Sequence, residues 1–120
     1  EKINVKVESD GAKAAYARGK ATFYAKRGQF NMSCADCHVY NAGKKARADI
    51  LSPALGHTTH VPMYRAKWGS LGTLHRRYGG CYKNMRAKPL MAQSPEYRDM
   101  EFFHQAMSNG LEITDARYRK

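Results

Sequence analysis

The stretch of residues 33–38 constrains what this chain can fold into more than any other feature, and it reads SCADCH. Two thiols three positions apart, followed at once by a histidine, form the pattern to which a c-type haem is covalently attached. The spacing lets Cys34 and Cys37 reach the two vinyl groups of one porphyrin, and it places His38 beneath the iron as the proximal ligand. A zinc or redox pair is the alternative, but the third and last cysteine leaves no second pair to complete a zinc site.

The length of 120 residues predicts a single domain spanning residues 1–120. A domain of this size buries about two-thirds of its unfolded surface, so a haem at its centre would form part of the core. No run of 18 or more apolar residues occurs, and no membrane span is expected. Haem is attached to CxxCH on the oxidising side of a bacterial membrane, which predicts a mature, processed protein in a periplasm or an equivalent non-cytoplasmic compartment.

The charge balance predicts a strongly basic surface, because 21 Lys and Arg residues outnumber 10 Asp and Glu residues and give a net charge of +11. Such surfaces attract nucleic acid, anionic lipid or acidic proteins. Location outside the cytoplasm argues against nucleic acid, so we expect an acidic redox partner or an anionic substrate. Solubility alone is the alternative, since the charges are scattered along the chain.

Helical patterns lie on both sides of the central region. Residues 12–26 are rich in Ala, Lys and Arg and predict a helix that stops at Gly28, with Gly19 in its interior for a packing reason. Residues 95–108 predict a second helix, with Ser94 as N-cap and Pro95 in the first turn. We expect the two helices to cross closely at Gly19, as the first and last helices of cytochromes c do. Residues 1–10 predict a short strand or an extended arm.

The central segments carry more turn signals than periodicity. Residues 39–62 predict a long loop over the haem, and residues 63–82 predict one or two short helices broken at Gly69. The expected fold class is therefore all-α: a small cytochrome c-type domain whose helices and long loops surround one haem.

Cys81 has no partner within the chain once Cys34 and Cys37 are bound to haem, and a thiolate is a known ligand of haem iron. Its position 43 residues after His38 falls in the part of small cytochromes c that supplies the distal ligand. An intermolecular disulfide is the alternative role. The competing ligands are the methionines and histidines that follow the haem motif: Met63, Met85, Met91, Met100, Met107, His57, His60, His75 and His104.

A succession of short motifs runs through most of the chain: GQFNMS at 28–33 before CADCH, LSP at 51–53, YR at 64–65, Trp68, LGTLHRR at 71–77, Cys81, EY at 96–97 and GL at 110–111. This succession resembles the haem domain of the SoxA subunit of the SoxAX thiosulfate-oxidising cytochromes. The resemblance implies that Cys81 is the distal ligand and can carry an extra sulfur atom, and that Arg77 lies at the active site. It therefore favours Cys81 as the distal ligand over a methionine or a histidine. Among the methionines, Met85 and Met91 are the first candidates.

The short chain also resembles the small His/Cys-ligated monohaem cytochromes of anammox bacteria, of the NaxLS type, because SoxA subunits carry an additional N-terminal half. We rank the resemblance to the anammox cytochromes above the resemblance to SoxA. It implies an electron carrier or a binder of nitric oxide or carbon monoxide rather than an enzyme, paired with a homologous small cytochrome in a heterodimer, or forming a homodimer. A thiosulfate-oxidising subunit with sulfur transfer at Cys81, and an ordinary His/Met carrier, are the alternatives.

Thiolate ligation has consequences that follow from charge. A thiolate favours ferric over ferrous iron, so we expect a low reduction potential. Positive charge beside a thiol favours the thiolate form, a role available to Arg77. On reduction the bond to Cys81 would loosen and admit a diatomic gas, with Gly79 and Gly80 providing backbone freedom or serving only a tight turn.

Overall fold

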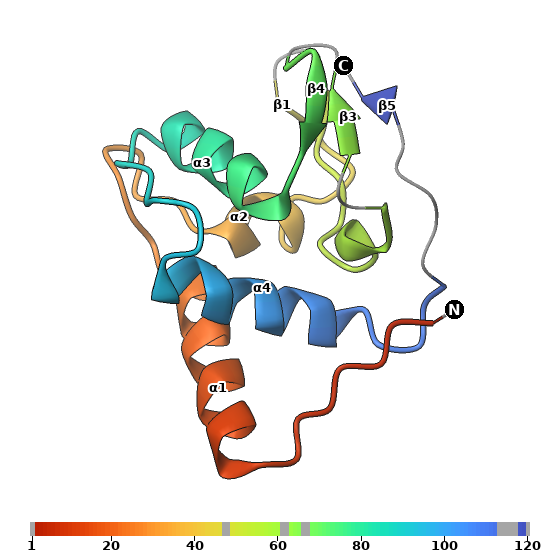
Figure 1. The fold of residues 1–120 in the computed structure, drawn as a ribbon. Helices are drawn as coiled ribbons and strands as arrows, with labels where there is room; N and C mark the ends of the chain where they lie inside the picture. Colours follow the sequence, from red (N-terminus) through yellow and green to blue (C-terminus); the bar gives the residue numbers. More distant parts are fainter. Residues whose placement is uncertain (1, 47–48, 61–62, 66–67, 113–117, 120) are drawn as a thin grey trace.

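The computed structural model describes residues 2–46, 49–60, 63–65, 68–112 and 118–119. Its helices are α1 (Asp10–Tyr24), α2 (Cys34–His38), the 3₁₀ helix η1 (His57–His60), α3 (Leu74–Asn84) and α4 (Pro95–Met107). Five short strands accompany them: β1 (Lys45–Ala46), β2 (Asp49–Ile50), β3 (Met63–Arg65), β4 (Ser70–Gly72) and β5 (Tyr118–Arg119). Helices form the body of the molecule, and the strands lie at its edge (Figure 1).

Helices α1 and α4 form in the predicted places and cross closely (Figure 1). Ser9 caps α1 by accepting a hydrogen bond from the Ala12 N–H, and Ser94 caps α4 in the same way from Tyr97. A Cβ placed on Gly19 would overlap the Asp99 carbonyl and lie 2.8 Å from the Phe103 Cβ. The predicted close crossing at Gly19 is therefore confirmed.

Gly28 does not end α1, contrary to prediction, because the helix ends at Tyr24 and Ala25 is already extended. Gly28 instead has φ +74° in a turn closed by paired hydrogen bonds between Arg27 and Met32. A Cβ there would lie 2.9 Å from the Ala87 nitrogen and would overlap the Met85 carbonyl. The glycine is thus required by a tertiary contact with the chain that follows α3.

The segment 63–72 contains no helix in its described residues, which also differs from the prediction. Strands β3 and β4 pair antiparallel around a turn that contains Gly69 at φ +67°, and β5 pairs parallel with β3. The helix begins only at Leu74, after Thr73 accepts a hydrogen bond from the Arg76 N–H as N-cap. Gly79 and Gly80 lie inside α3, so they form neither a tight turn nor a loose segment. Within the predicted loop 39–62, short paired strands β1 and β2 and the helix η1 are present.

The core has two parts that meet at α2. One part joins α3 to α4 through Leu74, Tyr78, Tyr82, Met85, Tyr97 and Met100. The other joins α1 to α4 and the segment after α2 through Phe23, Ala35, Ala54 and Phe103. Cys34 packs against both parts, so the haem motif lies where the two halves of the core meet.

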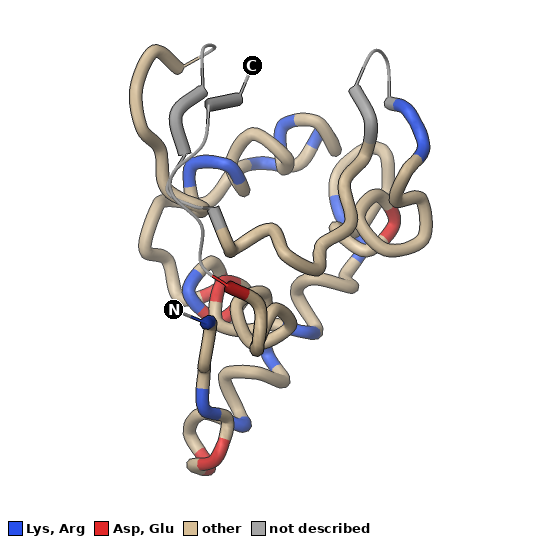
Figure 2. The backbone as a smooth tube through the Cα atoms, turned by 90° about the vertical axis from the view of Figure 1, so that its right-hand side faces the viewer, with Lys and Arg blue, Asp and Glu red and all other residues tan. Residues whose placement is uncertain are grey.

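The remaining features concern the ends and the surface. The N-terminal residues are extended, and buried Ile3 exchanges backbone hydrogen bonds of 2.8 and 2.9 Å with Leu111 and Gly110. Lys and Arg residues occur along much of the chain, and Asp and Glu residues are fewer than Lys and Arg (Figure 2). Within the described ranges, no helix is both long and apolar enough to cross a membrane.

Candidate functional site

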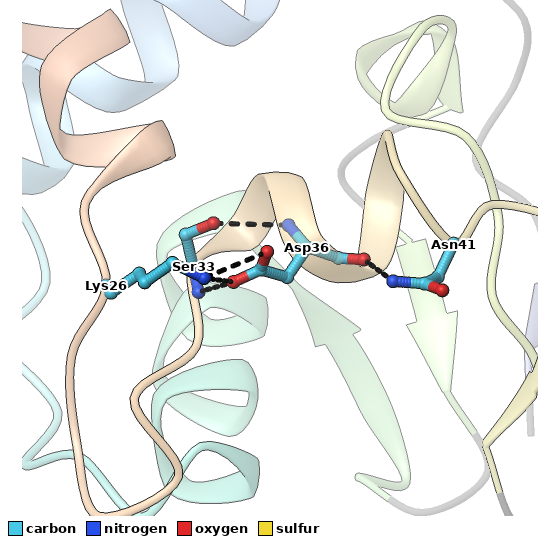
Figure 3. A network of polar contacts seen from close by, with 4 residues as sticks. All are labelled: Lys26, Ser33, Asp36 and Asn41. Carbon is cyan, nitrogen blue, oxygen red and sulfur yellow. Dashed lines mark hydrogen bonds and ion pairs between the residues drawn. The ribbon is translucent and has the colours of Figure 1, made fainter.

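The short helix α2 is held by a reciprocal cap (Figure 3). The Ser33 hydroxyl accepts a hydrogen bond from the Asp36 N–H at 3.1 Å, and the Asp36 carboxylate accepts one from the Ser33 N–H at 2.7 Å. Lys26 adds an ion pair to the same carboxylate at 3.1 Å. The Ser33 N–H, and then Lys26, lower the pKa of Asp36. Because five residues are too few for a helix to be stable by itself, this cap fixes the positions of the two thiols and His38.

His38 is oriented by the loop that follows it. Its Nδ1 donates a 2.7 Å hydrogen bond to the Ser52 carbonyl, because a carbonyl can only accept. Nε2 is then left with a lone pair, which is the state a metal-ligating histidine needs. Burial lowers the pKa of His38, the Ser52 carbonyl opposes that shift, and the positive charge of Arg77 adds to it. The ring is therefore held neutral in the tautomer that suits iron.

The two cysteines of the motif do not resemble a redox pair. No disulfide joins any of the three cysteines, and burial raises the pKa of the Cys34 thiol to about 12 and also raises that of Cys37. Redox-active CxxC pairs instead have lowered thiol pKa values. Among the described residues, no group of three or more His, Cys, Asp or Glu side chains is placed to hold a metal ion. The arrangement disfavours the zinc and redox alternatives and fits thioether attachment to a haem.

Cys81 and Arg77 lie beside this motif. Cys81 contributes to the raised pKa of both Cys34 and Cys37, which places the three sulfur atoms within electrostatic range of one another. Arg77 precedes Cys81 by one helical turn on α3, and its guanidinium lies 3.5 Å from the position of a Cβ on Gly80. Its effect on His38 shows that the same charge reaches the α2 side of the site. These electrostatic effects connect Cys81 with Cys34 and Cys37, and Arg77 with His38.

Two of the competing histidines already use the ring lone pair in a hydrogen bond, although the Nε2 of His75 has only an ion-pair contact and no hydrogen-bond partner among the described residues. Buried His75 accepts a hydrogen bond from the Gln93 N–H at 2.8 Å, and its Nε2 lies 2.5 Å from a Glu101 oxygen. His104 contacts the Tyr78 hydroxyl at 3.0 Å and the Ala54 carbonyl at 3.3 Å. Neither can offer a lone pair to iron without losing these partners. The third, His57, lies 2.6 Å from the Ser52 hydroxyl through its Nε2, with its ring 4.8 Å from that of His38.

The competing methionines differ in exposure, and the Met100 sulfur lies 4.0 Å from the Cys34 sulfur. Met85 and Met100 are core residues with exposed fractions of 5% and 0%, whereas Met91 is 85% exposed. Met107 packs against the second part of the core. The side chains of His60 and Met63 lie outside the described residues.

Two residues that position site side chains, Ser52 and Trp68, were missed in the sequence analysis. Ser52 orients His38, and the only sequence signal is the following Pro53, which favours an extended conformation at residue 52. Trp68 lies on Gly72, where a Cβ would overlap the indole ring, and the Arg76 guanidinium lies 4.4 Å from the centre of that ring. Arg76 is thereby tied to the β3–β4 hairpin, whereas Arg77 faces the site.

The sequence model of the SoxA/TsdA cytochrome c domain matches residues 18–113. The chain belongs to this family. The SoxA subunit of L-cysteine S-thiosulfotransferase from Chlorobaculum thiosulfatiphilum is 60% identical over 120 residues, covering the whole of this chain and 42% of the relative. The same subunit from Allochromatium vinosum is 47% identical over 119 residues, covering 99% of this chain and 42% of the relative. The chain thus spans less than half the length of these curated relatives.

Solved structures agree with the family. The SoxXA crystal structure from P. pantotrophus superposes with a TM-score of 0.91 at 34% identity, covering 99% of this chain and 44% of that chain. The thiosulfate dehydrogenase TsdBA from Marichromatium purpuratum superposes with a TM-score of 0.61 at 16% identity, covering 88% of this chain and 26% of that one, and so shows the fold alone. The predicted small cytochrome c fold is confirmed, and membership of the family implies one covalently attached haem c.

The comparisons reverse our ranking of the two resemblances. Chain length placed the small anammox cytochromes first, but the relatives and the superposed structure favour the SoxA alternative. Length was a poor discriminator because one haem domain of a longer subunit has the same size as a small monohaem cytochrome.

Proposed function

We propose that this chain is the haem-bearing domain of a SoxA-type subunit, which joins thiosulfate to a cysteine thiol with Cys81 and Arg77 at the site. The relatives are named L-cysteine S-thiosulfotransferase subunits, which supplies the reaction class. The observation that carries the proposal is the placement of Cys81, with Arg77 one turn before it, beside the CxxCH motif. A basic side chain at this position suits a dianionic substrate.

Each cofactor-binding residue has a distinct role in this proposal. Cys34 and Cys37 would hold the haem through thioether bonds, and His38, through its Nε2, and Cys81 would bind the iron. When bound, the haem supplies a one-electron acceptor close to Cys81. The hydrogen bond from the His38 Nδ1 to the Ser52 carbonyl, and the occupied lone pairs of His75 and His104, support this assignment.

The balance of the reaction indicates a partner. A thiolate and thiosulfate, which carries two negative charges, combine through one new S–S bond to give a monoanionic thiosulfonate and two electrons. The chain contains one CxxCH motif, and one haem takes one electron. A further one-electron acceptor is therefore needed for the other electron, and a c-type haem of another cytochrome subunit in a heterodimer would fill this role. The superposed SoxXA structure, in which SoxA is joined to SoxX, is consistent with such a pairing.

Arg77 is expected to bind the sulfonate end of thiosulfate. Its guanidinium can donate two parallel hydrogen bonds to two oxygens, whereas a lysine offers a point charge. The half-buried position of Arg77 strengthens the interaction relative to one in open water. Haem attachment on the oxidising side of a membrane places the complex in a periplasm or an equivalent compartment, and the net charge of +11 suits an acidic redox partner.

Four holoproteins test the proposal: wild type, Cys81→Ala, Arg77→Lys and the matched control Arg98→Ala, which alters an exposed arginine of α4. Each is mixed with thiosulfate, a cysteine acceptor and an oxidised c-type cytochrome, together with the partner subunit from the native source. We expect cytochrome reduction coupled to thiosulfonate formation in wild type and Arg98→Ala. Cys81→Ala should lose the activity, and Arg77→Lys should raise the thiosulfate concentration needed by about tenfold, the effect of losing one charged hydrogen bond.

Spectra separate the ligand assignment from the activity. Cys81→Ala should change the ferric absorption and electron paramagnetic resonance (EPR) spectra and raise the reduction potential, because a thiolate favours ferric iron. An unchanged ferric spectrum would remove Cys81 from the iron. Carbon monoxide added to the ferrous protein tests the gas-binding alternative: binding without thiosulfate turnover would favour that alternative. Light scattering after size exclusion tests the partner, and a monomer with no co-purifying cytochrome would contradict the heterodimer.

A further inference from the structure

A buried chain of hydrogen bonds joins α3 to the segment that follows the haem motif. The Tyr78 hydroxyl of α3 lies 3.0 Å from the His104 Nδ1 of α4, and the His104 Nε2 lies 3.3 Å from the Ala54 carbonyl. The Ala54 N–H in turn donates a 2.9 Å hydrogen bond to the His38 carbonyl. These links therefore begin one turn before Cys81 and end on the backbone of His38.

The direction of each hydrogen bond follows from the chemistry of the groups. The Ala54 carbonyl can only accept, so the His104 Nε2 carries the proton and Nδ1 accepts from the Tyr78 hydroxyl. Burial lowers the pKa of His104 to about 4 and raises the pKa of Tyr78. Both side chains therefore stay neutral at physiological pH, and there is one donor and one acceptor at every link.

The surroundings make these polar groups costly unless they are paired. Tyr78 and His104 are 7% and 4% exposed, and their rings are nearly parallel at 17° with centres 6.1 Å apart. Phe23 packs near the His104 ring and Tyr97 near the Tyr78 ring. Leaving a hydroxyl or imidazole unpaired in such a core is costly, so the native spacing of α3, α4 and Ala54 is the one that keeps both links formed.

We propose that Tyr78 and His104 are positioning residues that hold the helix bearing Cys81 in a fixed relation to the segment bearing His38. Tyr78 and Cys81 are three residues apart and share one face of α3, so a tilt of Tyr78 moves the Cys81 sulfur. At the other end, Ala54 and Ser52 bind the backbone and the ring of His38. The inference rests on the proposed ligand roles of His38 and Cys81.

The test compares ferric holoproteins that lose one link each: Tyr78→Phe, His104→Leu and the double variant. Tyr97→Phe is the matched control, because this fully buried phenol also loses one hydrogen bond, from the Leu90 N–H at 3.0 Å. EPR g-values and the reduction potential are the readouts, since both respond to axial-ligand geometry and not to stability as such. Thermal unfolding is recorded for each variant, so that the spectra of variants with similar losses of stability can be compared.

Tyr78→Phe and His104→Leu should each shift the g-values and the potential in the same direction, and the double variant should shift them no further, because the links act as one unit. His104→Gln should fall closer to wild type, since an amide can both donate and accept. Tyr97→Phe should lose stability without a spectral shift. The proposal is overturned if Tyr78→Phe behaves as Tyr97→Phe does, or if the effects of the single variants add. A spectrally silent Cys81→Ala would instead overturn the ligand assignment itself.

Discussion

Replacing Gly19 by alanine should destabilise the protein although alanine is the better helix former. The substitution in the interior of α1 would gain about 1 kcal/mol of helix propensity. The added Cβ would lie 2.6 Å from the Asp99 carbonyl carbon and 2.8 Å from the Phe103 Cβ, and it would overlap the Asp99 carbonyl oxygen. A backbone carbonyl inside α4 cannot rotate away, so the two helices must separate.

The magnitude follows from these opposing terms. Overpacking of a fixed contact costs about 1–3 kcal/mol, and the upper end applies here because the obstacle is backbone. Subtracting the propensity gain leaves a net loss of about 2 kcal/mol. Separation of α1 from α4 also disturbs the contact of the Phe103 ring with Tyr16, at 5.1 Å between ring centres. Gly19→Leu should be worse, since its larger side chain needs a wider gap.

Thermal unfolding of holoproteins, followed by circular dichroism, measures the loss of stability. Gly11→Ala is the matched control, because Gly11 also lies in α1 and a Cβ there meets nothing within 4 Å. The control should keep or gain stability, whereas Gly19→Ala should melt about 8 °C lower, at about 4 °C for each kcal/mol. If Gly19→Ala is as stable as Gly11→Ala, the close crossing does not constrain the fold and the reasoning fails.

Two further predictions concern the cap of α2 and the β3–β4 hairpin. The pKa of Asp36 is lowered in the folded state, so its stabilising effect is present above the unfolded pKa of about 4 and is lost as the pH falls through the folded pKa. The unfolding curves of wild type and Asp36→Asn should therefore converge at acid pH. A difference in stability that stays constant with pH would contradict the cap. Gly72→Ala should displace the Trp68 ring and weaken its contact with Arg76. Near-ultraviolet circular dichroism would detect this displacement as a changed tryptophan signal, and an unchanged signal would contradict the packing.

Local chemistry explains why some elements could be predicted. The helix at 95–108 was expected from Ser94 and Pro95, and the observed helix begins at Pro95 because a cap and a proline act within one turn. The sequence predicts one or two short helices over 63–82, but only α3 from Leu74 is helical, and strands β3 and β4 precede it. The close fit of Trp68 on Gly72 and the pairing with β5 depend on tertiary packing that a local window does not report. Gly28 was misread for the same reason, since its partner is the distant Met85–Ala87 segment.

The sequence by itself determined the chemistry of the haem motif: two thiols and a histidine at fixed spacing, a third cysteine with no partner, and an arginine one turn before it. These properties are local and depend on residue type and spacing. Tertiary structure alone decided which atoms face one another. It directs the Nδ1 of His38 to the Ser52 carbonyl, engages both nitrogens of His104, and places Cys81 beside Cys34 from 47 residues away, because contacts between distant segments depend on how the helices pack.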